Sequence, residues 1–60
     1  MDKTYEIVFI DESGYKFRTY ASDKSAEAAI AAARAASGKK DGWNIYSVFL
    51  LNPGKLVCAG

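Results

Sequence analysis

The first twenty positions of the chain alternate between apolar and polar residues in the manner of two β-strands. Residues 5–10 (YEIVFI) are rich in β-branched and aromatic side chains, and residues 15–20 (YKFRTY) alternate regularly. Both patterns are typical of half-buried strands. The four residues between them, Asp-Glu-Ser-Gly at 11–14, are turn formers. The pattern therefore predicts a β-hairpin.

The register of this hairpin follows from keeping apolar side chains on one face of the sheet. A two-residue loop would place Phe9 opposite Arg18, whereas a three-residue loop at 12–14 places Phe9 opposite Phe17. Gly14 can supply the left-handed residue that such a loop needs. We therefore predict the three-residue loop.

The middle of the chain is dominated by alanine, which indicates a helix. The predicted helix covers residues 23–36 (DKSAEAAIAAARAA), with Ser22 as its N-cap. Helical spacing places one set of small and apolar residues toward a core, namely Ala26, Ala29, Ile30 and Ala33. Glu27 and Arg34 are expected to point toward solvent.

The second half of the chain predicts another hairpin. Residues 44–51 (NIYSVFLL) form a strand that is apolar on both faces, and the turn 52–55 (NPGK) leads into a short strand at 56–59. The predicted order is ββαββ in a single domain, residues 1–60.

A single connecting helix leaves the second and third strands parallel, so we expect the third strand to pair with the first. The predicted fold is therefore α+β: a four-stranded antiparallel sheet in the order 2-1-3-4, with the alanine-rich helix packed on one face. The expected core residues are Ile7, Phe9, Phe17, Ile30 and Trp43.

Composition narrows the classes of function. The 60 residues include 8 basic and 7 acidic side chains, for a net charge of +1, with no histidine and a single cysteine, Cys58. An internal disulfide and a Cys/His zinc site are therefore excluded, and we expect no metal and no cofactor. Apolar runs are too short to cross a bilayer, and the first residues lack the apolar core of a signal peptide. We expect a cytoplasmic protein with no membrane partner.

Catalysis has little support in the sequence. Histidine-based acid–base chemistry is impossible, and there is no Gly-rich phosphate loop. Cys58 lies in an apolar strand without a base, and Asp11 and Glu12 lie in a hairpin turn. We expect that the protein is not an enzyme.

The stretch SGKKDGW at 37–43 allows two interpretations. In the first, Gly38 ends the helix, Lys39 and Lys40 lie favourably near the helix C-terminus, and Trp43 begins the next strand as a core residue. In the second, the two lysines hold a phosphate while Trp43 stacks on a base. We favour the first, because two lysines release few counterions and a nucleic-acid partner usually faces a larger basic excess.

The sheet face opposite the helix is the main candidate site. Strand alternation places there Glu6, Val8, Ile10, Lys16, Arg18 and Tyr20. The third strand adds either Tyr46, Val48 and Leu50 or the alternate set Ile45, Phe49 and Leu51. We expect the first set outward, because the second set joins Trp43 as the larger apolar group. An apolar patch with a charged rim is typical of a protein interface.

We therefore expect a small, non-catalytic protein-binding module that pairs face to face with a second copy, because pairing buries area that so short a chain lacks. The predicted interface residues are Val8, Ile10, Lys16, Arg18, Tyr20, Tyr46, Val48 and Leu50. The alternative is a binder of single-stranded nucleic acid, in which Tyr20 and Tyr46 stack on bases and Lys16 and Arg18 contact phosphates.

Overall fold

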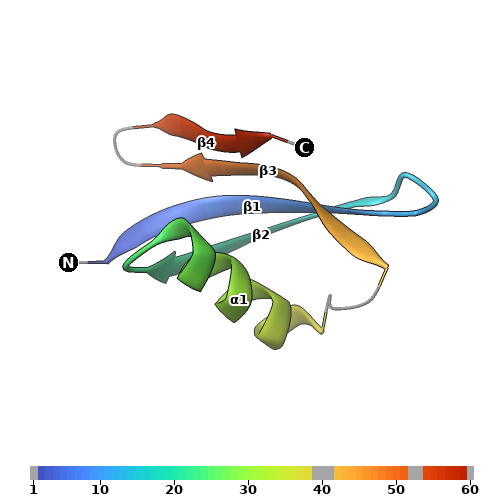
Figure 1. Cartoon of the computed structure of the whole chain (residues 1–60), viewed down its shortest axis with the longest axis horizontal. Helices are drawn as coiled ribbons and strands as arrows, with labels where there is room; N and C mark the ends of the chain where they lie inside the picture. The colour runs from blue at the N-terminus through green and yellow to red at the C-terminus, as the bar shows by residue number, and fades with distance from the viewer. Residues whose placement is uncertain (1, 39–41, 52–53, 60) are drawn as a thin grey trace.

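The computed structural model describes residues 2–38, 42–51 and 54–59. Figure 1 shows five elements: strand β1 (Lys3–Asp11), strand β2 (Lys16–Asp23), helix α1 (Ala26–Ser37), strand β3 (Trp43–Leu50) and strand β4 (Lys55–Ala59). The strands form one antiparallel sheet in the order β2-β1-β3-β4, and the helix packs against it. The predicted α+β class and strand order are confirmed.

The β1–β2 hairpin has the predicted register. Phe9 pairs with Phe17, and a three-residue loop at 12–14 connects the strands. The Asp11 amide donates to the Tyr15 carbonyl at 3.0 Å, and the Gly14 amide donates to the Asp11 carbonyl at 3.1 Å. Gly14 has a φ of 91°, in the left-handed region that side chains disfavour.

The helix begins three residues later than predicted. Its N-cap is Ser25, whose hydroxyl accepts a hydrogen bond from the Ala28 amide at 3.2 Å. Ser22, the predicted cap, belongs instead to β2. Its hydroxyl lies 2.9 Å from that of Thr4 on β1, so cross-strand pairing extends the hairpin through this position. At the other end, Gly38 closes the helix with a φ of 72°, as predicted.

The core lies between α1 and the middle of the sheet. Its buried members are Tyr5, Ile7, Phe9, Ala29, Ala33 and Val48. Phe17, Ile30 and Trp43 are partly buried and pack against this cluster. Of the five predicted core residues, two are therefore fully buried members of the core and three lie at its border. The alanines let the helix approach the sheet closely, and Phe9 and Ile7 supply the bulk.

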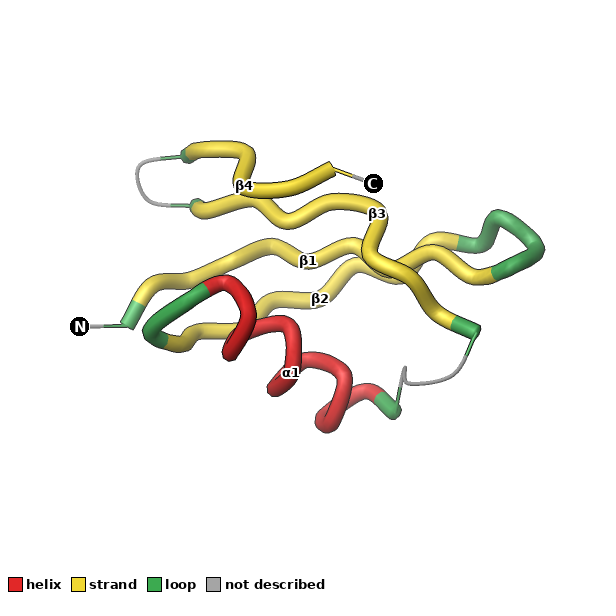
Figure 2. The backbone as a smooth tube through the Cα atoms, viewed as in Figure 1, coloured by secondary structure: helices red, strands yellow, loops and turns green. Residues whose placement is uncertain are grey.

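The helix covers only part of one sheet face. It contacts β2 and β1, whereas β3 and β4 continue the sheet beyond it (Figures 1 and 2). The opposite face carries no helix. Two regions of the sheet are therefore not covered by the helix: the whole face opposite α1, and the end of the β3–β4 hairpin that lies beyond the helix.

Candidate interface on the open sheet face

Strand alternation decides which side chains lie on the open face, the one away from α1. Tyr5, Ile7 and Phe9 point into the core, so the alternate residues of β1 point the other way. The cross-strand partners of these outward residues complete the face: Glu6, Val8 and Ile10 on β1; Lys16, Arg18 and Tyr20 on β2; Asn44, Ser47 and Phe49 on β3; and Leu56 on β4.

The prediction that Val48 and Leu50 face outward is wrong. Val48 has no exposed surface, and Leu50 packs against the core cluster. These two residues lie opposite Ile7 and Tyr5 of β1, which fixes them on the helix side.

The physical reason is an irregularity in β3. The register with β1 shifts between Val8 and Phe9, whose partners are Ser47 and Ile45, and Tyr46 is left between them. Such a bulge inverts the parity of side chains from one side of it to the other. Ile45 and Val48 therefore both point inward.

Two apolar open-face residues were not among the predicted interface residues. Phe49 points outward, whereas the prediction had Val48 and Leu50 outward, and Leu56 lies opposite Phe49 on β4. Leu56 is 55% exposed. Phe49 belonged to the alternate set considered from the sequence, but no local signal identified Leu56.

The other predicted interface residues come together as expected. Val8 and Ile10 are partly buried neighbours on β1, and Tyr20 and Tyr46 are exposed. The Lys16 ammonium lies 4.3 Å from the centre of the Tyr46 ring, a cation–π contact that crosses β1. The open face therefore combines an apolar strip with exposed tyrosines.

The charged groups of the open face contact one another. The Tyr20 hydroxyl donates to Glu6 Oε2 at 3.2 Å, and an Arg18 guanidinium nitrogen lies 3.9 Å from the same oxygen. These are exposed contacts and add little to stability. The Glu6 carboxylate therefore contacts Tyr20 and Arg18, two residues to which the nucleic-acid alternative assigns contacts with bases and phosphates.

Trp43 lies at the other candidate site, beside an acidic turn. It pairs with Asp11 across the sheet, and the Tyr15 ring packs edge-on against it at a centroid distance of 6.1 Å. Lys39 and Lys40, predicted to act with Trp43 in the alternative function, lie outside the described residues. The described surroundings of Trp43 carry both signs of charge: Asp11 and Glu12 of the turn lie on one side, and the Arg34 guanidinium lies at the Trp43 carbonyl.

Arg34 does not simply point into solvent, contrary to the sequence prediction. It is partly buried, and one of its guanidinium nitrogens donates to the Trp43 carbonyl at 2.9 Å. Its guanidinium carbon lies 5.3 Å from the centre of the Phe9 ring. Arg34 thereby ties the last turn of α1 to the start of β3.

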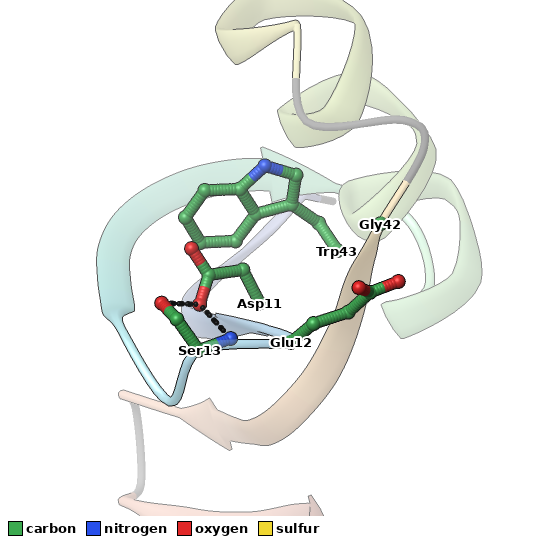
Figure 3. Close-up of a pocket in the computed structure, with 5 residues that line it drawn as sticks. All are labelled: Asp11, Glu12, Ser13, Gly42 and Trp43. Carbon is green, nitrogen blue, oxygen red and sulfur yellow. Dashed lines mark hydrogen bonds between the residues drawn. The ribbon is translucent and has the colours of Figure 1, made fainter.

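Asp11 organises the β1–β2 turn beside Trp43 (Figure 3). Its Oδ1 accepts hydrogen bonds from the Ser13 hydroxyl at 2.7 Å, the Tyr15 amide at 2.9 Å and the Ser13 amide at 3.0 Å. The hydroxyl of Ser13 is the largest cause of a lowered pKa at Asp11, assisted by the backbone amides. Asp11 is therefore a carboxylate at neutral pH.

Other kinds of site find no support in the described parts of the chain. Within residues 2–38, 42–51 and 54–59, no three metal-ligating side chains come together. No helix there has the length and apolar composition needed to cross a membrane. Comparison of the chain with protein-family models, with curated proteins and with solved structures gave no match.

Proposed function

We propose that this protein is a small binding module whose open sheet face associates with a second copy of the chain. The observation that carries the proposal is the apolar strip on the face that α1 leaves bare. Val8 and Ile10 point to that face from β1, Phe49 lies diagonal to Val8 as the partner of Glu6, and exposed Leu56 lies beyond Phe49. An apolar strip rimmed by polar residues is typical of a protein interface.

Self-association would use most of the open face. The molecule measures 35 by 20 Å across its two longest axes, and stable interfaces bury about 1,200–2,000 Å² in total over the two partners. A chain of 60 residues also gains much from the added burial, because short chains bury a small fraction of their surface.

The charges on the open face also suit self-association. Lys16 and Arg18 lie on β2, and Glu6 lies on the neighbouring strand, so the face carries both signs. In a two-fold dimer each copy offers its carboxylate to a cation of the other. The same contacts favour a protein partner over a nucleic acid, because Lys16 and Arg18 already engage Tyr46 and Glu6.

The substitution Ile10→Glu tests the proposal. A buried carboxylate at the turn-side end of the apolar strip should abolish association. Within one chain the change should cost little stability, because position 10 pairs with Lys16 and the new carboxylate has the opposite charge to the lysine. Sedimentation equilibrium at high micromolar concentration should show a dimer for the unchanged protein and a monomer for this variant.

The matched control is Ala31→Glu, which places the same charge on the exposed side of α1 and should leave the dimer intact. A monomeric unchanged protein at that concentration contradicts the proposal. Binding of a fluorescent single-stranded oligonucleotide that weakens steeply with salt would instead support the nucleic-acid alternative.

A further inference from the structure

The two ends of the open face differ in charge, which limits how two copies can stack. The outward residues of β1 are Glu6, Val8 and Ile10 in order along the strand. Ile10 pairs with Lys16 near the β1–β2 turn, whereas Glu6 pairs with Phe49 toward the other end of the sheet. One end of the face therefore has a cation beside an apolar residue, and the other end has a carboxylate beside an apolar residue.

Two sheets that pack face to face can be related by a two-fold axis in two ways. Such sheets usually keep their strand directions within about 30° of each other, so the axis runs either nearly along the strands or nearly across them. An axis along the strands gives a parallel stack, with both β1–β2 turns at the same end of the dimer. An axis across the strands gives an antiparallel stack, with β1 on β1 of the second copy and the turns at opposite ends.

The parallel stack leaves Glu6 without a cation from the second copy. An axis that covers the apolar strip exchanges β1 with β3, so Glu6 faces Phe49 of the second copy, because these two residues share one level of the sheet. The cations of the second copy then lie two strand spacings away, about 10 Å to the side. Burial of the carboxylate is unfavourable in this arrangement, because only contacts within its own chain offset it.

The antiparallel stack removes this difficulty. When the axis passes at Val8, the middle outward residue of β1, the levels of Glu6 and Ile10 are exchanged between the copies. Ile10 of one copy then lies beside Phe49 of the other. Lys16, the neighbour of Ile10, comes beside Glu6. Symmetry produces each contact twice.

We infer that the two sheets stack antiparallel and that Glu6 of each copy pairs with Lys16 of the other. This inference rests on the dimer proposed above and specifies how one copy recognises the next. The Arg18 guanidinium already lies 3.9 Å from Glu6 of its own chain, whereas the exposed Lys16 contacts a tyrosine ring. Lys16 is therefore the cation that can turn to a carboxylate of the second copy, and the open face becomes complementary to itself in charge.

Two charge reversals test the pairing. Glu6→Lys and Lys16→Glu each place like charges together twice in a homodimer, so each should weaken self-association at least about tenfold. An equimolar mixture of the two variants restores opposite charges at both contacts of a heterodimer. Sedimentation equilibrium should therefore show that the mixture associates about as tightly as the unchanged protein, and this rescue also shows that both variants fold.

The matched control is Glu27→Lys, the same change of charge at an exposed position of α1. Its mixture with Lys16→Glu has the same net charges, but it should not rescue association of the Lys16→Glu chains. Equal rescue in both mixtures would reduce the effect to net charge and overturn the pairing. Variants that dimerise as tightly as the unchanged protein, or a mixture without rescue, would overturn the pairing and leave the dimer standing. A monomeric unchanged protein would remove both.

The distance between the two β1–β2 turns tests the orientation without charge reversals. Glu12 is exposed in this turn, four residues beyond Val8, and Glu12→Cys combined with Cys58→Ser gives one labelling position in each chain. With about 3.4 Å per residue and about 10 Å between sheets, two nitroxide labels should lie about 30 Å apart in the antiparallel stack and about 15 Å apart in the parallel one. Double electron–electron resonance measures this distance. A value near 15 Å would overturn the antiparallel stack.

Discussion

The two hairpins of this sheet differ in what covers them. β1 and β2 lie under α1, and the inward side chains of β1 are buried against helix alanines. The β3–β4 hairpin extends past the helix (Figure 1), and its far end carries three large apolar residues that are 42–55% exposed, namely Leu51, Leu56 and Val57. One chain thus contains a well-covered half and a poorly covered half.

The regularity of strand pairing also differs between the two hairpins. β1 and β2 pair without interruption from Lys3–Asp23 to Ile10–Lys16. β3 has a register shift against β1 and another against β4. We infer that the first hairpin and the helix supply most of the stability, whereas the second hairpin contributes much of the apolar surface available for association.

The largest effect should follow from truncating the covered half. Phe9 is fully buried and faces α1, so Phe9→Ala should cost about 3–5 kcal/mol of unfolding free energy. A chain of this length has a total of about 3–9 kcal/mol, so much of the population should unfold. Circular dichroism during urea titration measures this.

Leu56→Ala is the counterpart in the poorly covered half. Because Leu56 is mostly exposed in the monomer, the loss should stay within about 0.5 kcal/mol. The measurement is made at low protein concentration, where association adds nothing. Similar losses in both variants would show that the core extends through both hairpins, contrary to the comparison.

A second, smaller effect tests how closely the helix approaches the sheet. Ala29 is fully buried at that contact, so Ala29→Leu should overpack it and cost about 1–3 kcal/mol. Ala32→Leu makes the same change on the exposed side of α1 and should alter stability by less than about 0.5 kcal/mol. Leucine has good helix propensity at both positions. Equal urea midpoints for the two variants would indicate a loosely packed helix.

Much of the covered half could be predicted from local patterns. The alternation of residues 15–20, the turn at 11–14 and the parity of Phe9 and Phe17 together determine the first register. Helical spacing identified Ala29 and Ala33 as inward, and Gly38 as the helix end. Each of these features depends on residues a few positions apart, where sequence patterns are informative.

What escaped prediction depends on contacts between distant residues. The sequence of β3 has apolar residues at both odd and even positions. Alternation therefore gives no sign of the bulge that turns Val48 inward. Ser22 and Ser25 are equally good caps by type, and the pairing of Ser22 with Thr4 decides between them. Arg34 has a position suited to solvent, but its length allows it to reach the Trp43 carbonyl.

The smallest expected effect concerns the turn that closes the covered half. Asp11 has a lowered pKa because it accepts hydrogen bonds from Ser13 and from backbone amides of the turn. A carboxyl whose pKa is lower in the folded state contributes stability above its unfolded pKa of about 3.9, and this contribution is lost as the pH falls through the folded pKa. Asp11→Asn removes the charge and retains an acceptor oxygen. The variant should be slightly less stable than the unchanged protein at pH 7, and the gap between their urea midpoints should narrow below pH ~3.9. A gap that stays constant between pH 7 and pH 2.5 would show that the hydrogen-bond geometry, and not the charge of Asp11, supports the turn.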